Sequence, residues 1–163
     1  MKGLPFTLCL LCMARCSTLV QAAEAAPLSL KSSGAVTGLA VRIVEDDSYS
    51  VRIDYFYPAT DAAARKALWQ GVGGAWQDPA GQLHEQGAPF NVFLRIYDID
   101  AAVVVQDRRI SHPTVSSWGS GVLHAELSEV RLRPGHYQIT IERRGSAEPI
   151  DDYRAGVSVV RAY

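Results

Sequence analysis

The sequence predicts an all-β domain, an immunoglobulin-like antiparallel β-sandwich of about seven strands with one short helix inserted between the second and third. Three observations lead to this class. Apolar and polar residues alternate with a period of two, most clearly from Tyr49 to Tyr57. Polar turns such as Glu45-Asp46-Asp47 separate the alternating runs. A Pro134-Gly135 turn precedes Tyr137, as expected where the fifth and sixth strands of such a sandwich meet.

The turn before Tyr137 is predicted to form a tyrosine corner. Pro134 fixes φ near the value of a first turn position, and Gly135 supplies the positive φ often needed next. The ring of Tyr137 is then expected to pack under the turn, with its hydroxyl bonded to a backbone group a few residues upstream. A plain hairpin with a tyrosine at its inner edge is the alternative.

Seven segments carry a strand pattern, and Leu28 and Leu30 are candidates for an additional short edge strand. The predicted strands are 38–44, 48–57, 90–97, 102–110, 122–132, 136–143 and 155–162. In the fifth strand, the apolar positions change phase between Leu127 and Val130, which predicts a bulge or local turn near Ser128.

The long connection between the second and third strands is predicted to contain the helix. Asp61 is a good N-cap, and residues 62–69 are mostly helix formers. Glycines at 71, 73 and 74 end the helix, and residues 75–88 show no period and are predicted as loop.

The alternation of strand direction sorts the connections between two ends of the sandwich. Short turns at 45–47, 98–101 and 133–135 share one end, and the longer connections 58–89, 111–121 and 144–154 share the other. Sandwiches of this class commonly bind partners with the loops of one end. The candidate binding residues there are Trp76, His84, His112, Trp118, Asp151 and Asp152. The alternative is that Trp69 and Trp76 cover the open end of the core.

Composition and motifs give no sign of a cofactor, a metal or a catalytic site. The formal net charge is −1, so neither nucleic acid nor a polybasic membrane patch is implied. The four histidines lie on separate segments without metal-ligand spacing, and no nucleophile-elbow pattern appears. Asp98-Ile99-Asp100 is interpreted as a polar turn, and Arg143-Arg144 as a solvated strand end. The sequence therefore predicts a protein that is not an enzyme.

Residues 1–25 are interpreted as a signal peptide, and residues 26–163 as a single β-sandwich domain. Lys2 precedes an apolar run that is too short to span a bilayer, and small residues of cleavage-site type follow it around Ala22 and Ala25. The mature protein is expected in the periplasm or secreted, without a transmembrane helix; an anchor that stays attached is the alternative. All three cysteines lie in this leader. Cys16 is a candidate for lipidation and outer-membrane anchoring, although Arg15 stands where a small residue is wanted.

Four features, taken in order, resemble a family of proteobacterial envelope proteins. They are Ser48-Tyr49-Ser50 at the start of a strand, the segment Leu68 to Gly74, Gly87-Ala88-Pro89-Phe90 before an alternating strand, and Leu132-x-Pro134-Gly135-x-Tyr137. The family consists of uncharacterised signal-bearing proteins, often lipoproteins, that share a domain of unknown function. The resemblance implies a β-sandwich in the cell envelope and supplies no catalytic residues. Arg15 before Cys16 departs from the lipoprotein members.

The leading functional hypothesis is an exported, non-enzymatic β-sandwich that binds a macromolecular partner, in the first place a protein, through its long-loop end. An envelope immunity or inhibitor protein is a narrower version of it. A carbohydrate-binding module is the first alternative, because aromatic rings such as those of Trp76 and Trp118 can stack on sugar rings. A hydrolase that uses His84 or His112 with a carboxylate is the second.

Overall fold

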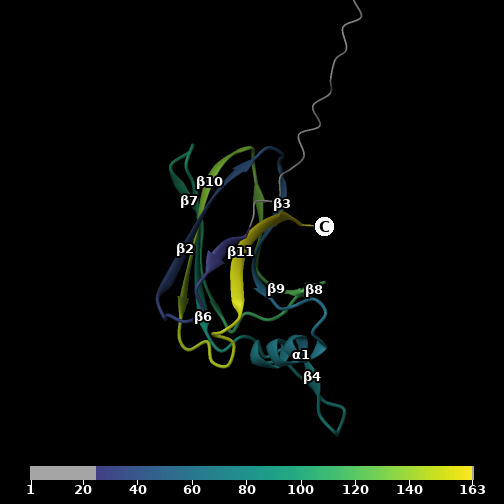
Figure 1. The fold of residues 1–163 in the computed structure, drawn as a ribbon. Helices are drawn as coiled ribbons and strands as arrows, with labels where there is room; N and C mark the ends of the chain where they lie inside the picture. Colours follow the sequence, from purple (N-terminus) through teal and green to yellow (C-terminus); the bar gives the residue numbers. More distant parts are fainter. Residues whose placement is uncertain (1–24, 163) are drawn as a thin grey trace, which may run out of the picture.

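A computed structural model describes residues 25–162; the predicted leader with Cys16 falls in residues 1–25 and lies almost wholly outside this range. Two antiparallel sheets face each other, as Figure 1 shows, which confirms the predicted fold class. In spatial order the five-stranded sheet is β1 (Ala26–Leu28), β11 (Arg154–Arg161), β3 (Asp47–Phe56), β9 (Val122–Leu132) and β8 (Ser117–Gly119). The four-stranded sheet is β2 (Ala35–Ile43), β10 (Gly135–Arg144), β6 (Asn91–Asp98) and β7 (Val103–Ser111).

The helix and a small hairpin lie in the connection between β3 and β6. Helix α1 spans Ala62–Gly71, and β4 (Trp76–Gln77) pairs with β5 (Leu83–His84). The prediction of loop throughout 75–88 was therefore wrong, as was the loop assigned to residues 117–119, which form β8. These strands have only two or three residues, too few to show a period in the sequence.

All seven predicted long strands are present, with ends that differ from the predicted ones by at most three residues. β3 pairs with β9, as the second strand pairs with the fifth in an immunoglobulin domain. β6 pairs with β10, as the third strand pairs with the sixth there. The outer strands differ from that order. β2 pairs with β10 and β11 pairs with β3, so the first and last long strands lie in the opposite sheets.

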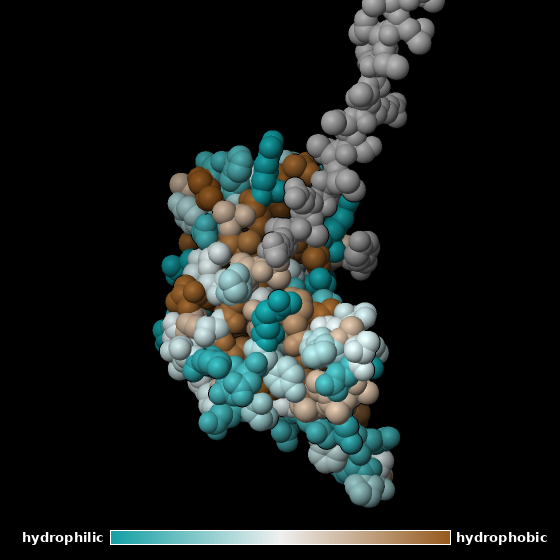
Figure 2. Space-filling view, viewed as in Figure 1, coloured by the Kyte–Doolittle hydropathy of each residue, from teal (hydrophilic) through white to brown (hydrophobic). Residues whose placement is uncertain are grey.

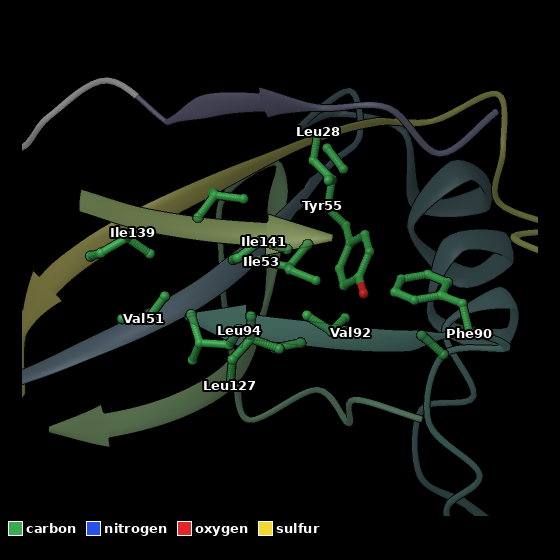
Figure 3. Packing of buried hydrophobic residues seen from close by; sticks show 14 of the residues in the cluster. Leu28, Val51, Ile53, Tyr55, Phe90, Val92, Leu94, Leu127, Ile139 and Ile141 are labelled. Carbon is green, nitrogen blue, oxygen red and sulfur yellow. The ribbon is translucent and has the colours of Figure 1, made fainter. Parts of the chain in front are cut away.

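Alternate residues of the inner strands fill the space between the sheets. On β3 these are Val51, Ile53 and Tyr55, which are fully buried, and Figure 3 shows them among inward side chains of β6 and β10. The hydroxyl of Tyr55 is buried without a hydrogen-bond partner within residues 25–162, and burial raises the pKa of this phenol. The core therefore comes from the residues that the alternation assigns to the inner face.

The predicted tyrosine corner is confirmed. The hydroxyl of Tyr137 donates to the carbonyl oxygen of Arg133 at 3.0 Å, and the side chain is buried under the turn. The positive φ predicted for Gly135 is wrong, because this residue is already the first of strand β10 and has extended backbone. Tyr49 repeats the arrangement at the β2–β3 connection, where its hydroxyl donates to Glu45 O at 3.1 Å. Two tyrosines thus secure two turns of the same end of the sandwich.

The predicted bulge near Ser128 is also confirmed. Val51 of β3 faces Ser128, and the next residue, Arg52, faces Glu126. Leu127 is therefore an extra residue on β9, and this lets Ala125 before it and Val130 and Leu132 after it all point toward the core.

Pairing registers place the connections at two ends as the alternation of directions predicts. Ile43 lies opposite Gly135, and Tyr137 lies opposite Asp98, so the short turns meet at one end. Phe56, at the end of β3, lies opposite Val122 of β9 on one side and opposite Arg154 of β11 on the other. The longer connections therefore meet at the opposite end of the sandwich. The helix and the hairpin belong to this long-loop end (Figure 1).

Arg143 corrects one interpretation from the sequence. It is only 1% exposed and not a solvated strand end. Its guanidinium lies over the ring of Phe90, donates to Gly145 O at 2.6 Å and to Ser29 O at 3.3 Å, and has a pKa lowered by burial. The inward position on β10 that alternation would give to an apolar residue is taken here by a cation that ties two loop segments to the sheet.

Removing the corner hydroxyl is expected to weaken the fold. Tyr137→Phe should lower the free energy of unfolding by about 0.5–1.5 kcal/mol, the usual net contribution of one hydrogen bond. Urea denaturation measures it. Tyr97→Phe is the matched control, because no hydrogen bond of the Tyr97 hydroxyl is seen within residues 25–162. Equal midpoints for both variants would contradict a stabilising corner.

Candidate binding site at the long-loop end

Helix α1 forms the base of the candidate site. Asp61 caps it as predicted, with its carboxylate accepting from Ala64 N at 2.8 Å. Leu68 is fully buried in the core, and the hydroxyl of Tyr153 donates to Ala64 O at 3.3 Å. The helix is therefore attached to the sandwich along one face, and its other face is exposed.

Two tryptophans from different connections meet beside this helix. Trp118 on β8 is 61% exposed and contacts Trp69 of α1 edge to face, with ring centroids 5.9 Å apart and planes at 83°. A hollow of about 450 Å³ lies there. Its lining residues are Ala62, Arg65, Lys66, Trp69 and Trp118. The site thus combines indole surface with two cationic side chains.

The hairpin presents the third tryptophan. Trp76 is 50% exposed and stacks on the ring of His84, with centroids 4.7 Å apart. His84 Nε2 lies 3.0 Å from Asp78 Oδ2, and this hydrogen bond is the largest of the causes that lower the pKa of Asp78. Figure 1 shows the hairpin projecting away from the sheets. Trp76 is not among the residues packed against the core, so the alternative in which Trp76 covers the core is wrong. Trp69 does pack against the core.

Trp69 joins the two aromatic groups. Its indole Nε1–H donates to Ala75 O at 3.0 Å, immediately before Trp76, while its ring contacts Trp118. Figure 2 shows a largely hydrophilic surface on the projecting hairpin and more apolar surface over the helix above it.

The remaining predicted residues are not part of this group. His112 Nδ1 lies 3.0 Å from Ala88 O, which gives the ring a structural role in the loop. Asp152 forms an exposed ion pair with Lys31 at 3.3 Å, and Asp151 is half-buried beside it. The structure thus brings Trp118 and Trp76 near α1. His112, Asp151 and Asp152 lie outside this aromatic group.

Backbone contacts between glycines hold the loops together. Gly73 O accepts from Gly87 N at 3.0 Å, and both residues have positive φ. A Cβ atom at Gly87 would lie 2.0 Å from His112 O. Gly73 and Gly87 belong to the β3–β6 connection and His112 to the connection after β7, and these two connections can approach so closely only because Gly87 has no side chain.

Sequence reasoning missed Arg65, Lys66 and the pair Asp54–His124. The first two line the Trp69–Trp118 hollow from α1. The last two face each other across β3 and β9 on the outer side of the sheet. Alternation marks both as outward-facing, but only the pairing of β3 with β9 brings them together. Residues 25–162 contain no group of three or more His, Cys, Asp or Glu side chains that could hold a metal ion. No helix among them is long and apolar enough to cross a bilayer.

Comparison with known families identifies the domain. Residues 25–161 match the model of a domain of unknown function, DUF5625. The chain belongs to the DUF5625 family. The resemblance to an uncharacterised family is confirmed at this level, and the signal-bearing, often lipoprotein character stays a prediction. No curated protein matches the sequence significantly.

Solved structures show what the DUF5625 domain resembles in shape. A crystal structure of a protein from Sulfurospirillum deleyianum is 15% identical, with a TM-score of 0.65 over 85% of this chain and 96% of that one. This likeness shows a shared fold. A family 35 carbohydrate-binding module from an environmental isolate is 10% identical over 89% of this chain and 83% of that one, with a TM-score of 0.39. One from Cellvibrio japonicus is 14% identical over 86% and 95%, with a TM-score of 0.38. Scores this low support no inference about function.

Two glycines of positive φ test the packing of the loops. Gly87→Ala should cost about 3–5 kcal/mol, because the strain of a positive φ adds to a backbone clash. Gly81→Ala is the control: its φ is also positive, but the nearest atom to an added Cβ is 3.9 Å away, so only about 1–2 kcal/mol is expected. Chemical denaturation compares them. Equal losses would show that the loops do not depend on this approach.

Acid is expected to loosen the hairpin. The folded pKa of Asp78 lies below its ordinary value of 3.8, so the stabilisation is present above that value and is lost as the pH falls through the lower folded value. Amide NMR signals of Ala80 and Gln82, which donate to Asp78, should shift during this titration. Asp78→Asn is the control and should abolish the pH dependence; an unchanged titration in this variant would contradict the assignment.

Proposed function

We propose that the DUF5625 domain is an exported, non-enzymatic binding module that holds another protein at its long-loop end. The observation that carries the proposal is the exposed indole of Trp118, set against Trp69 in a hollow with two cationic side chains. The leader pattern of residues 1–25 supports export. An envelope protein that blocks a toxin or a hydrolase is the narrower form of the proposal.

The chemistry of the hollow matches the centre of a protein interface. Tryptophan and arginine are the residues most enriched among those that dominate binding energy. Trp118 exposes a large apolar ring, and its burial by a partner would remove that surface from water. Arg65 and Lys66 add positive charge beside it, so a partner with acidic residues around an apolar side chain is the best complement.

The binding residues are held in place before a partner arrives. Trp118 lies on β8, opposite Leu123 of β9, and Trp69 is fixed by its bond to Ala75. Rigid aromatic side chains lose little conformational entropy on binding, which favours affinity. The site is therefore preorganised on a sheet edge and a helix.

A carbohydrate-binding module is the second candidate. The observation that favours it is the presence of two exposed tryptophans, Trp76 and Trp118, near one helix. Stacking on His84 orients the ring of Trp76 and leaves its other face available to a flat ligand. An oligosaccharide that spans both rings would use this arrangement.

The hydrolase alternative has no comparable support. His84 faces a carboxylate, but within residues 25–162 no serine or threonine hydroxyl is hydrogen-bonded to a histidine ring. A double substitution of His84 and His112 by alanine tests this alternative directly, since any hydrolytic activity it leaves unchanged cannot depend on them.

The main experiment is affinity capture with the mature domain. A partner captured by the wild type should be lost with Trp118→Ala, with affinity reduced about 30-fold or more, the effect of a central interface residue. Ile99→Ala is the matched control, because this apolar residue is 47% exposed at the opposite end of the sandwich. Calorimetry with the purified partner measures both variants.

Glycan titrations distinguish the two candidates. Quenching of tryptophan fluorescence by an oligosaccharide, abolished by Trp76→Ala, would favour the carbohydrate-binding module. Capture of a protein that Trp118→Ala leaves unaffected, together with retained binding across substitutions in all three long connections, would overturn the proposed contact surface.

A further inference from the structure

A hollow of about 570 Å³ lies on the outer face of the five-stranded sheet, apart from the tryptophan site. Neighbouring strands supply its polar residues in three cross-strand rows. Asp54 of β3 lies opposite His124 of β9, and Arg52 of β3 lies opposite Ser158 of β11. A third row adds Phe56 of β3 opposite Arg154 of β11. All of these positions alternate with core residues, so they face away from the sandwich interior.

The backbone explains why this face is hollowed. Gly156 is the β11 partner of Asp54, so one position in the row carries no side chain. Strand β1 passes beside it and forms a wall with Ala25 and Pro27. The bulge at Leu127 adjoins Arg52 and bends β9 locally. Asp54 points outward into this hollow but is only 4% exposed, because the side chains of His124 and Arg52 lie against its carboxylate.

One carboxylate holds the polar residues in position. Asp54 Oδ1 lies 2.6 Å from His124 Nδ1 and 3.1 Å from Arg52 Nε. Arg52 Nε also donates to Ser158 Oγ at 3.0 Å. Because Nδ1 of His124 faces this carboxylate, the proton lies on Nδ1, and Nε2 is left for another partner.

Several donors in the hollow are unused within residues 25–162. Arg52 engages only Nε, so its four terminal N–H groups have no partner there. Arg154 stacks on Phe56, with its guanidinium carbon 4.6 Å from the ring centroid, and forms no ion pair with a described residue. The lining of the hollow thus holds two guanidiniums and one carboxylate. The nearby carboxylate of Glu126, opposite Arg52 on β9, accepts from Ser50 Oγ at 2.7 Å and does not line the hollow.

The remaining lining is apolar. Phe56, Val122 and Val160 contribute hydrophobic surface next to the guanidiniums. Sites of this kind, apolar with a few convergent polar groups, are typical of pockets for small molecules. Arginine is the residue best suited to a carboxylate, which it binds in bidentate fashion.

We propose that this hollow is a second binding site, for a small organic carboxylate with an apolar body. The terminal N–H groups of Arg52 bind the carboxylate, and Phe56, Val122 and Val160 contact the apolar body. Arg154 closes the hollow at the side of Phe56. Asp54 and His124 are positioning residues that hold Arg52 in place. The site is independent of the proposed function at the long-loop end.

The test uses hexanoate as the probe and the whole mature domain. NMR titration should shift the amide signals of residues 52–56 and 122–124, and leave the indole signal of Trp118 unchanged. Hexanamide, which has the same apolar body without the charge, should bind at least about ten-fold more weakly, as expected for loss of a charge-assisted hydrogen bond. Inorganic phosphate, an anion without an apolar body, should bind no better than hexanamide.

Variants locate the site. Arg52→Ala and Arg154→Ala should each weaken hexanoate binding, the first by about ten-fold or more. Arg154 is exposed and outside the Asp54 network, so its variant carries the test if Arg52→Ala does not fold. His136→Ala is the matched control: His136 forms an exposed pair with Asp100 at 3.1 Å, near the other end of the sandwich. Equal binding of hexanoate and hexanamide, or no loss in either arginine variant, would overturn the proposal.

Discussion

Burial of one face of each sheet against the other is the constraint on which the rest of the structure depends. Inward residues of β3 such as Ile53 meet Leu94 of β6 and Ile141 of β10, and all three are fully buried. Since side chains alternate along a strand, the residues before and after each core residue point their side chains to the outer face of the sheet. The outer-face cluster around Asp54 is thus a direct consequence of core packing, as its neighbours Ile53 and Tyr55 point inward.

Different contacts hold the connections at the two ends of the sandwich. At the short-turn end, Tyr137 and Tyr49 bond the backbone of the turns they cover. At the long-loop end the connections are longer. They are held by a close backbone contact at Gly87 and by hydrogen bonds of the buried Arg143 guanidinium to loop carbonyl groups. The short-turn end is thus closed by hydrogen bonds from tyrosine side chains, while the long-loop end leaves Trp76 and Trp118 exposed.

The two candidate sites differ in chemistry as well as in place. The hollow beside Trp118 and Trp69 is shallow and aromatic, with cationic residues supplied by α1, and suits a large partner. The hollow above Asp54 is lined by cross-strand rows, with charged groups held by one another, and suits a small one. A sandwich can carry both, because one site is built on the connections and the other on the sheet.

Local pattern determined the strands, the helix cap at Asp61, the bulge near Ser128 and the turn of Tyr137, because each depends on periodicity or on the preferences of a few adjacent residues. Alternation of direction also determined which connections share an end. Only the tertiary structure decided that β2 joins β10 and β11 joins β3, because alternation does not specify a strand's neighbour. The same limit hid the meeting of Asp54 with His124 and of Trp69 with Trp118, which lie far apart along the chain and come together through pairing and packing alone.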